Sequence, residues 1–407
     1  MKNRAIQSRI KKLVCRFSLL LAVAIFPGSS VSAQSPAPED IIAASIKAIG
    51  GQASVNRIRS IYAFASCRGP RGAYTTEIQS ARGNRLMFKQ VRVGGNTFIG
   101  YVNGETAWTV DSRKQEFSLL DKTGAWMIRG HEFQMIPLAL GERYKNFSVE
   151  GKENFAGASC IKIRAVDELN LTTYLFFNWQ TKLLAGVISP NPASDKGEVI
   201  TVVYKEWRTV GKVKIPGKVR ATDSTGDFLL DFHTIRLNTV DNKIFAIPAT
   251  VTAQVELMQM HEQARKAHFG KDAKLMVSMF ADDHINISAG KINRPIREDI
   301  IKRIQGYFDQ VEFIEWDDME PPIIRVAKDA SMAYKIVKKR VRLKTQNEQG
   351  QTVEETTIFA WMETYEKANG KWILKAVAST NEPPSFELFK ANRDPAMEAI
   401  QSYQENQ

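Results

Sequence analysis

The hydrophobic pattern changes its period once along the chain, near residue 250. From Ile58 to about Pro248, short stretches of alternating apolar and polar residues are separated by turn-forming residues, which is typical of an antiparallel sheet. After Ala249, apolar residues recur at helical spacing before strand-like alternation returns. A chain of 407 residues is also usually split between at least two cores. The pattern therefore predicts an α+β protein with two domains.

The first 33 residues have the features of a secretion signal. Six basic residues and no acidic one precede the apolar run Phe17 to Phe26, and Val31-Ser32-Ala33 supplies small residues for cleavage. The run is too short to span a bilayer, and Pro27-Gly28 ends it; an uncleaved anchor is the competing interpretation. We expect an exported protein, periplasmic or secreted, with no transmembrane segment after cleavage. The predicted divisions are 1–33, a domain over 34–250, a domain over 251–381 and a tail over 382–407.

Local signals place the helices within the two domains. Asp40 caps a helix that ends at Gly50-Gly51, and a second helix is predicted from Ala125 to Leu140. In the second domain, helices are expected through His268, after Asp272 and over 297–308, followed by strands over 323–327, 332–343, 356–367 and 372–379. Residues 367–371 form the turn between the last two strands.

The charge of the chain does not indicate a nucleic-acid partner. The formal net charge is +12, but the signal segment carries six of these charges, and the remaining ones are interspersed. The densest basic cluster is predicted to be a solvated strand face; an acidic partner or anionic membrane surface is the alternative. Its members are Lys335, Lys338, Lys339, Arg340, Arg342 and Lys344.

Two cysteines follow the signal segment, Cys67 and Cys160. Export would allow a disulfide between them, which would close a long loop. However, Cys67 continues an apolar alternation, whereas Cys160 alternates with Lys162 and Arg164. A disulfide and two unpaired, small hydrophobic side chains are both open.

The second domain resembles the SnoaL-like branch of the nuclear transport factor 2 superfamily. The resemblance covers about residues 253–380 and rests on two helices, Phe280-Ala281-Asp282-Asp283, a third helix, and final strands that meet at Tyr365-Glu366-Lys367 and Gly370-Lys371-Trp372. It implies a cone-shaped sheet closed by helices over an apolar pocket. Self-association is common in this family, so a homo-oligomer is one implied assembly.

The first domain is similar to periplasmic lipoprotein carriers such as LolA. The similarity spans about residues 39–250 and rests on Ala48-Ile49-Gly50-Gly51, Phe155-Ala156-Gly157 and Ile244-Phe245-Ala246-Ile247-Pro248. It implies an antiparallel half-barrel sheet with helices, and a cavity for an apolar or acyl-bearing ligand.

The cone that the resemblance implies is the expected place for site residues in the second domain. Ketosteroid isomerases related to this fold have a base aspartate where this chain has Ser288, and a hydroxyl cannot do that work. His284 is a weak candidate for a general base, and it shares a strand face with Asn286 and Ser288. Aromatic side chains are the other candidates for a pocket wall, although core packing also accounts for them. They are Tyr307, Trp316, Phe359, Trp361 and Tyr365.

No cofactor or metal is indicated by the sequence. His261 and His268 are two helical turns apart, about 10 Å, so they cannot both bind one ion. The chain also has no glycine-rich phosphate loop, no Gly-x-Ser-x-Gly elbow and no Cys-x-x-Cys.

Three functions follow as hypotheses. The first is an exported, non-enzymatic protein that binds an apolar small molecule or lipid, chiefly in the half-barrel. The second is an enzyme in the cone, an isomerase, cyclase or hydrolase acting on a small apolar substrate through His284 with Tyr307 or Tyr365. The third is a self-association module. All three rest on fold resemblance.

Overall fold

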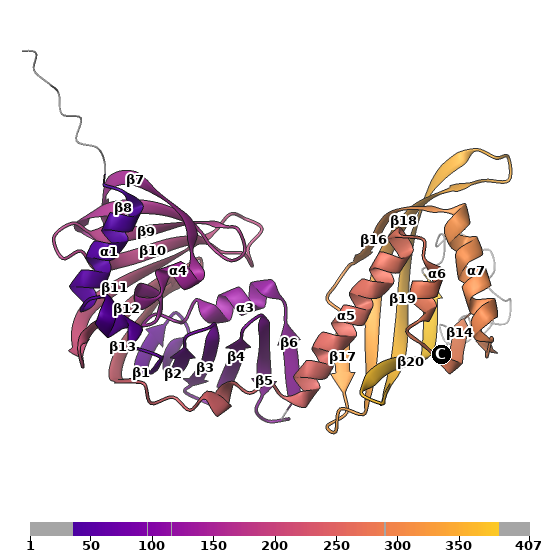
Figure 1. Cartoon of the computed structure of the whole chain (residues 1–407), viewed down its shortest axis with the longest axis horizontal. Coiled ribbons are helices and arrows are strands. Elements are labelled where there is room, and N and C mark those ends of the chain that lie inside the picture. The colour runs from indigo at the N-terminus through magenta and orange to yellow at the C-terminus, as the bar shows by residue number, and fades with distance from the viewer. Residues whose placement is uncertain (1–35, 96, 115, 289, 382–407) are drawn as a thin grey trace, which may run out of the picture. The chain divides into compact units, whose positions relative to one another are not determined.

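The computed structural model describes residues 36–381 apart from 96, 115 and 289, and its strands form two open sheets (Figure 1). One sheet uses strands between residues 60 and 237, and the other uses strands between 280 and 381. The predicted signal segment and the predicted tail lie outside the described residues, and the predicted domain limits stay predictions. Among residues 36–381, no helix is both long and apolar enough to cross a membrane.

The first sheet has thirteen strands in the order β6-β5-β4-β3-β2-β1-β13-β12-β11-β10-β9-β8-β7, and every neighbouring pair is antiparallel. Its strands are β1 (Ser60–Gly69), β2 (Gly72–Ala81), β3 (Arg85–Arg92), β4 (Thr97–Asn103), β5 (Thr106–Asp111), β6 (Glu116–Leu120), β7 (Lys145–Phe155), β8 (Ala158–Val166), β9 (Thr172–Asn178), β10 (Leu184–Pro190), β11 (Val199–Val210), β12 (Val213–Asp223) and β13 (Gly226–Leu237). The antiparallel sheet predicted from the alternation is present.

Alternation along these strands buries one face in a common core. On β8, Ile161, Ile163 and Ala165 join the largest apolar cluster of this region, together with Ala63 and Ala65 of β1. Successive side chains of a strand point to opposite faces, so the intervening residues face the other side. The first sheet therefore has one continuous apolar face.

Helices accompany the first sheet before and between its strands. They are α1 (Pro38–Ile49), α2 (Gln52–Asn56), α3 (Lys122–Arg129), η1 (Ile136–Leu138), α4 (Leu140–Arg143) and η2 (Asn242–Phe245). The single helix predicted from Ala125 to Leu140 is wrong. Instead, α3 begins after Asp121, whose side chain accepts a hydrogen bond from the Gly124 amide, and packs against β3 to β6 (Figure 1). Gly130 follows α3, and Pro137 lies in the short 3₁₀ helix η1. Proline cannot donate the backbone hydrogen bond that a longer helix needs, so no single helix spans this segment.

The second sheet has the order β15-β14-β20-β19-β18-β16, and β17 also pairs with β18. Its strands are β14 (Phe280–Ser288), β15 (Lys291–Asn293), β16 (Glu312–Asp318), β17 (Ile323–Val326), β18 (Met332–Gln346), β19 (Thr352–Ala368) and β20 (Lys371–Asn381). The pairing of β14 with β20 is parallel, and the other pairs are antiparallel. The predicted turn joins β19 to β20 through Asn369 and Gly370, both with positive φ, as a two-residue hairpin of type I′ requires.

Three helices pack with the second sheet: α5 (Ala249–Phe269), α6 (Ala273–Val277) and α7 (Arg297–Gln310). Leu257 and Ala264 of α5 share a core with Phe308 of α7 and with strand residues such as Val341. Asp272 caps α6 by accepting a hydrogen bond from the Leu275 amide, as predicted.

Cys67 and Cys160 are both free and buried, so of the two alternatives the structure has the unpaired thiols. Cys67 lies on β1 and Cys160 on β8, and five strands of the sheet separate them. Cys160 packs with Phe155 and Phe176, on the face opposite to Ile161. A disulfide needs Cα atoms about 4.4 to 6.8 Å apart, which this strand order does not allow.

Candidate functional site

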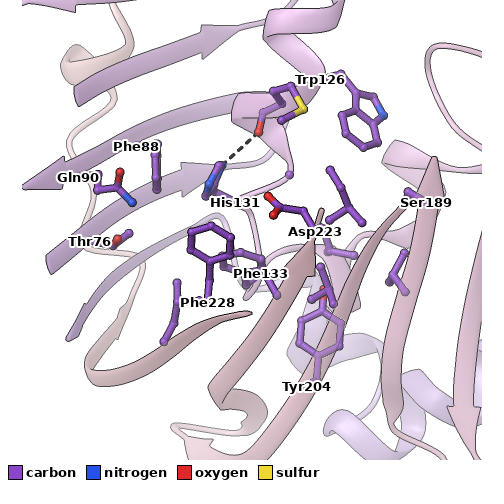
Figure 2. Close-up of a pocket in the computed structure, with 18 of the residues that line it drawn as sticks. Thr76, Phe88, Gln90, Trp126, His131, Phe133, Ser189, Tyr204, Asp223 and Phe228 are labelled. Atoms are coloured by element: carbon purple, nitrogen blue, oxygen red, sulfur yellow. Dashed lines mark hydrogen bonds between the residues drawn. The ribbon is translucent and has the colours of Figure 1, made fainter. Parts of the chain in front are cut away.

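The first sheet encloses a cavity on its apolar face. Strands β2, β3 and β4 line one side, β10 to β13 line the other, and α3 with the segment that follows it contributes between them. Four strands lie between β2 and β10 in the sheet, so the sheet bends to bring both to one cavity. Figure 2 shows Thr76 and Gln90 on one side, and Tyr204 and Ser189 on the other.

Apolar and aromatic side chains make up most of the cavity wall. The volume is about 370 Å³, within the range of small-molecule pockets. The aromatic residues in the wall are Tyr74, Phe88, Phe98, Trp126, Phe133, Tyr144, Tyr204 and Phe228. A wall of this kind binds an apolar group through burial, which stabilises the complex by about 25 cal/mol per Å² removed from water.

His131 is a neutral member of this wall. Its ring stacks on Phe88 with a centroid separation of 3.8 Å, and its Nδ1 lies 3.1 Å from the carbonyl oxygen of Met127, a hydrogen bond drawn in Figure 2. Burial lowers the pKa of His131 to about 4. At neutral pH this side chain therefore adds an uncharged ring to the cavity.

A group of buried charges lies beside the cavity. Glu132 is 3.4 Å from Arg129 and 3.6 Å from Arg143, and Arg129 also pairs with Glu168. Arg143 Nη1 donates a hydrogen bond to the Arg129 carbonyl oxygen at 2.7 Å. The two arginines therefore share Glu132, and the guanidinium of Arg143 is held in one orientation.

Three donors of residues in the cavity wall lack a hydrogen-bond partner within residues 36–381: the hydroxyl of Thr76 on β2, the hydroxyl of Tyr204 on β11, and Nε of Arg143. All three atoms are buried. An unpaired buried donor is costly, so each of these groups needs an explanation.

Most of the residues predicted for a pocket belong to the core of the second sheet. Trp316 and Tyr365 are buried in this core, and Phe359 and Trp361 pack against it half-buried. Tyr307 on α7 is 42% exposed. None of the predicted residues lines the cavity described above.

The three polar residues predicted on β14 share the inner face of that strand. His284 is buried, its ring lies 4.4 Å from that of Phe280, and its Nδ1 is 3.3 Å from the Leu374 carbonyl oxygen. The hydroxyl of Ser288 donates to the side-chain oxygen of Asn286 at 3.2 Å. Burial lowers the pKa of His284, so the ring is neutral at pH 7. A role for these residues in binding or catalysis stays a prediction.

The basic cluster on β18 is not a solvated face. Lys335 and Lys339 are each 1% exposed, whereas Lys338, Arg340 and Arg342 point outward. The prediction is wrong for the two buried lysines because strict alternation along β18 places them on the same face as the core residues Val337 and Val341.

Each buried lysine is neutralised by a carboxylate. Lys335 pairs with Glu363 at 2.8 Å, and Lys339 pairs with Asp318 at 2.7 Å. Glu363 also accepts hydrogen bonds from Trp361 at 2.8 Å and from the Tyr365 hydroxyl at 2.6 Å. Burial alone would raise the pKa of Glu363, but these partners lower it.

The two predicted helix histidines have separate partners. Nε2 of His261 is 2.8 Å from Asp318, and Nδ1 of His268 is 2.7 Å from the Ala264 carbonyl oxygen. The ring of His268 stacks on Trp316 at 4.3 Å, and burial lowers its pKa to about 4. Both histidines are packing residues of α5.

The residues of the cavity wall were not predicted individually. A signal exists in the alternation of Ile200, Val202 and Tyr204 on β11, where a hydroxyl follows two aliphatic residues on one face. That pattern marks an inner face, but it does not reveal that β2 lies across the cavity from β11.

No protein-family model matches the chain, and no curated protein matches it. Solved structures do match it in fold. A LolA superfamily protein from Nitrosomonas europaea is 11% identical, covers 52% of this chain and 99% of its own, and has a TM-score of 0.39.

Matches to the second fold are shorter. A ketosteroid isomerase-like protein from Erwinia carotovora atroseptica is 12% identical over 32% of this chain and 96% of its own, with a TM-score of 0.27. A protein from Exiguobacterium sibiricum, described as a calcium/calmodulin-dependent kinase II association domain, is 14% identical over 32% of this chain and 95% of its own, also with a TM-score of 0.27. At these identities the similarities concern the fold alone.

Proposed function

We propose that this protein is exported and binds an apolar, acyl-bearing small molecule in the cavity of the first sheet. The observation that carries the proposal is the cavity itself, about 370 Å³ with a mostly apolar and aromatic wall. A domain normally fills such a space with side chains, since interiors are close-packed. A cavity that side chains leave unfilled is better explained by a ligand that occupies it.

The proposal does not extend to catalysis in the second sheet. The charged groups gathered there, Lys335 and Glu363, are paired with each other, and Tyr365 donates to the same carboxylate. Groups that already satisfy one another are not free to bind a substrate.

The test is displacement of a neutral fluorescent probe, N-phenyl-1-naphthylamine, by methyl dodecanoate. The full chain should bind the probe with increased fluorescence and release it to the ester. The variant Val202→Trp, which places a large side chain in the cavity, should lose at least about tenfold in affinity for the probe, the equivalent of 1.4 kcal/mol.

Val203→Trp is the matched control. Val203 is the next residue of β11 and packs against the cluster on the opposite face of the sheet, so its replacement should leave probe binding unchanged. If both variants bind the probe like the unsubstituted protein, or if the unsubstituted protein does not bind it, the proposed function is wrong.

A further inference from the structure

Tyr204 and Arg143 each leave one donor unused in the cavity wall. Tyr204 is 5% exposed and Arg143 is 7% exposed, so water does not reach these groups freely. Within the described part of the chain, neither the Tyr204 hydroxyl nor Arg143 Nε has an acceptor. Leaving a buried donor unmet costs about 1 to 3 kcal/mol, and more when the group is charged.

Tyr204 and Arg143 both line this cavity, and Tyr204 belongs to the same apolar cluster as Tyr144, the residue that follows Arg143 in the chain. Burial raises the pKa of Tyr204, the nearby Tyr144 raises it further, and the positive charge of Arg143 lowers it. The raised pKa keeps the hydroxyl protonated, so Tyr204 is a donor. An arginine side chain has no acceptor, so the two groups cannot satisfy each other through Arg143.

The orientation of Arg143 is set by other contacts. Its Nη1 donates to the Arg129 carbonyl oxygen at 2.7 Å and lies 3.6 Å from Glu132. Glu132 is shared with Arg129, which also pairs with Glu168, so two carboxylates lie against the two guanidinium groups while Arg143 Nε stays without an acceptor within residues 36–381. The cavity wall thus offers one O–H donor, from Tyr204, and one N–H donor, from the positively charged guanidinium of Arg143.

A carboxylate also lies in the wall, but at a different point along the strands. Asp223 is the acidic member of the described lining residues, and it accepts hydrogen bonds from the amide and hydroxyl of Thr225. In the register of β11 with β12, Thr222 pairs with Thr201, whereas Tyr204 pairs with Val219. The Cα atom of Asp223 is thus displaced from that of Tyr204 by about 13 Å along the strands, four residues at about 3.3 Å each.

We propose that the ligand of this cavity is a single-chain amphiphile with an anionic head, a carboxylate or a phosphate, which accepts hydrogen bonds from Tyr204 and Arg143 Nε. The inference rests on the proposed function, since the acyl chain occupies the apolar part of the same cavity. The anionic head accepts a hydrogen bond from each of the two donors and lies away from the carboxylate of Asp223. Charge-assisted hydrogen bonds of this kind are about twice as strong as neutral ones.

The experiment compares three ligands of equal chain length on the full chain by probe displacement: dodecanoate, dodecyl phosphate and methyl dodecanoate. We expect at least one of the two anions to bind at least about tenfold more tightly than the ester, as one hydrogen bond to a charged group provides. Whichever anion binds more tightly identifies the head.

Substitution at the two donors should remove this preference. Tyr204→Phe deletes only a hydroxyl that has no partner within the described residues, so the variant should fold normally, and the ratio of its affinity for the anion to its affinity for the ester should fall about tenfold. Arg143→Lys keeps the charge but lacks Nε, and should also weaken anion binding. Tyr101→Phe is the matched control, because Tyr101 lies on β4 outside the cavity wall and should keep the preference.

The outcomes separate the two proposals. If the ester and both anions bind equally well, or if Tyr204→Phe and Tyr101→Phe behave alike, the anionic head is wrong while the apolar site stands. If none of the three ligands displaces the probe, the proposed function fails and the anionic head fails with it.

Discussion

The two sheets bury polar groups in different ways. In the second sheet, Glu363 is paired with Lys335 and accepts hydrogen bonds from Trp361 and Tyr365. In the first sheet, within residues 36–381, the hydroxyl of Tyr204 and Nε of Arg143 stay without partners next to a cavity. The comparison teaches that a buried polar group alone does not mark a binding site. A buried group that is paired within the protein has a structural role. A buried donor without a partner beside a cavity indicates a group that hydrogen-bonds to a ligand.

The largest effect is expected from breaking the paired cluster of the second sheet. Lys335→Met leaves the carboxylate of Glu363 buried without its cation, and it should lower the free energy of unfolding by about 3 to 5 kcal/mol. Urea denaturation measures this change. Lys338→Met, on the exposed face of the same strand, should change the stability by less than about 0.5 kcal/mol. Equal effects of the two substitutions would contradict the internal pairing.

A smaller effect is expected from pH, and it involves one histidine of each sheet region. His131 and His268 have folded pKa values of about 4, below the usual unfolded value of about 6.5, because burial disfavours the charged ring. The contribution of each neutral ring to the free energy of unfolding is therefore fully present above pH 6.5. It is lost as the pH falls toward 4, by up to about 3 kcal/mol for each ring.

Denaturation at pH 7.0, 5.5 and 4.0 tests this expectation. His268→Phe and His131→Phe should each show a shallower loss of stability between pH 6.5 and 4 than the unsubstituted protein. If the stability of each variant falls with pH as steeply as that of the unsubstituted protein over this range, these rings do not titrate as stated. Adding dodecanoate at each pH extends the comparison, because His131 lines the cavity and His268 belongs to the core of the second region.

Two tyrosine substitutions test most directly the difference between paired and unpaired buried hydroxyls. Tyr365→Phe removes a hydroxyl that donates to Glu363, and it should cost about 1.5 to 3 kcal/mol of stability. Tyr204→Phe, measured without ligand, should change the stability by less than about 0.5 kcal/mol or slightly increase it, because its hydroxyl has no partner among the described residues. Thermal melts of both variants give the answer, and the reverse order of effects would overturn the distinction between paired and unpaired groups.

The smallest effect is expected from reducing agents. Cys67 and Cys160 are free and buried, and burial raises the pKa of the Cys67 thiol to about 11. Dithiothreitol should leave the melting temperature unchanged, and both thiols should react with a maleimide only after denaturation. Labelling followed by peptide mass spectrometry distinguishes the two residues. A melting temperature that falls on reduction would show that they are bonded after all.

Local pattern predicted much of the secondary structure because it depends on neighbours in sequence. Asp272 as a cap and Asn369-Gly370 as a turn are set by a few adjacent residues, and both have the expected roles. The segment 125–140 was mispredicted because its apolar spacing suits a helix, whereas Gly130 and Pro137 favour two short helical pieces. The basic cluster on β18 was mispredicted because composition alone does not show which alternate residues face inward.

The sequence by itself determined the change from sheet to mixed helix and sheet near residue 250, the cap at Asp272 and the turn at Asn369-Gly370. The predicted cap at Asp40 was wrong, because α1 begins two residues earlier, at Pro38. Only the tertiary structure decided that Tyr204 and Arg143 line one cavity, that Lys335 is buried against Glu363, and that five strands separate Cys67 from Cys160. The physical reason is range. Periodicity and capping act over a few residues, whereas a cavity or an ion pair depends on strand order and sheet curvature, which bring together residues far apart in the chain.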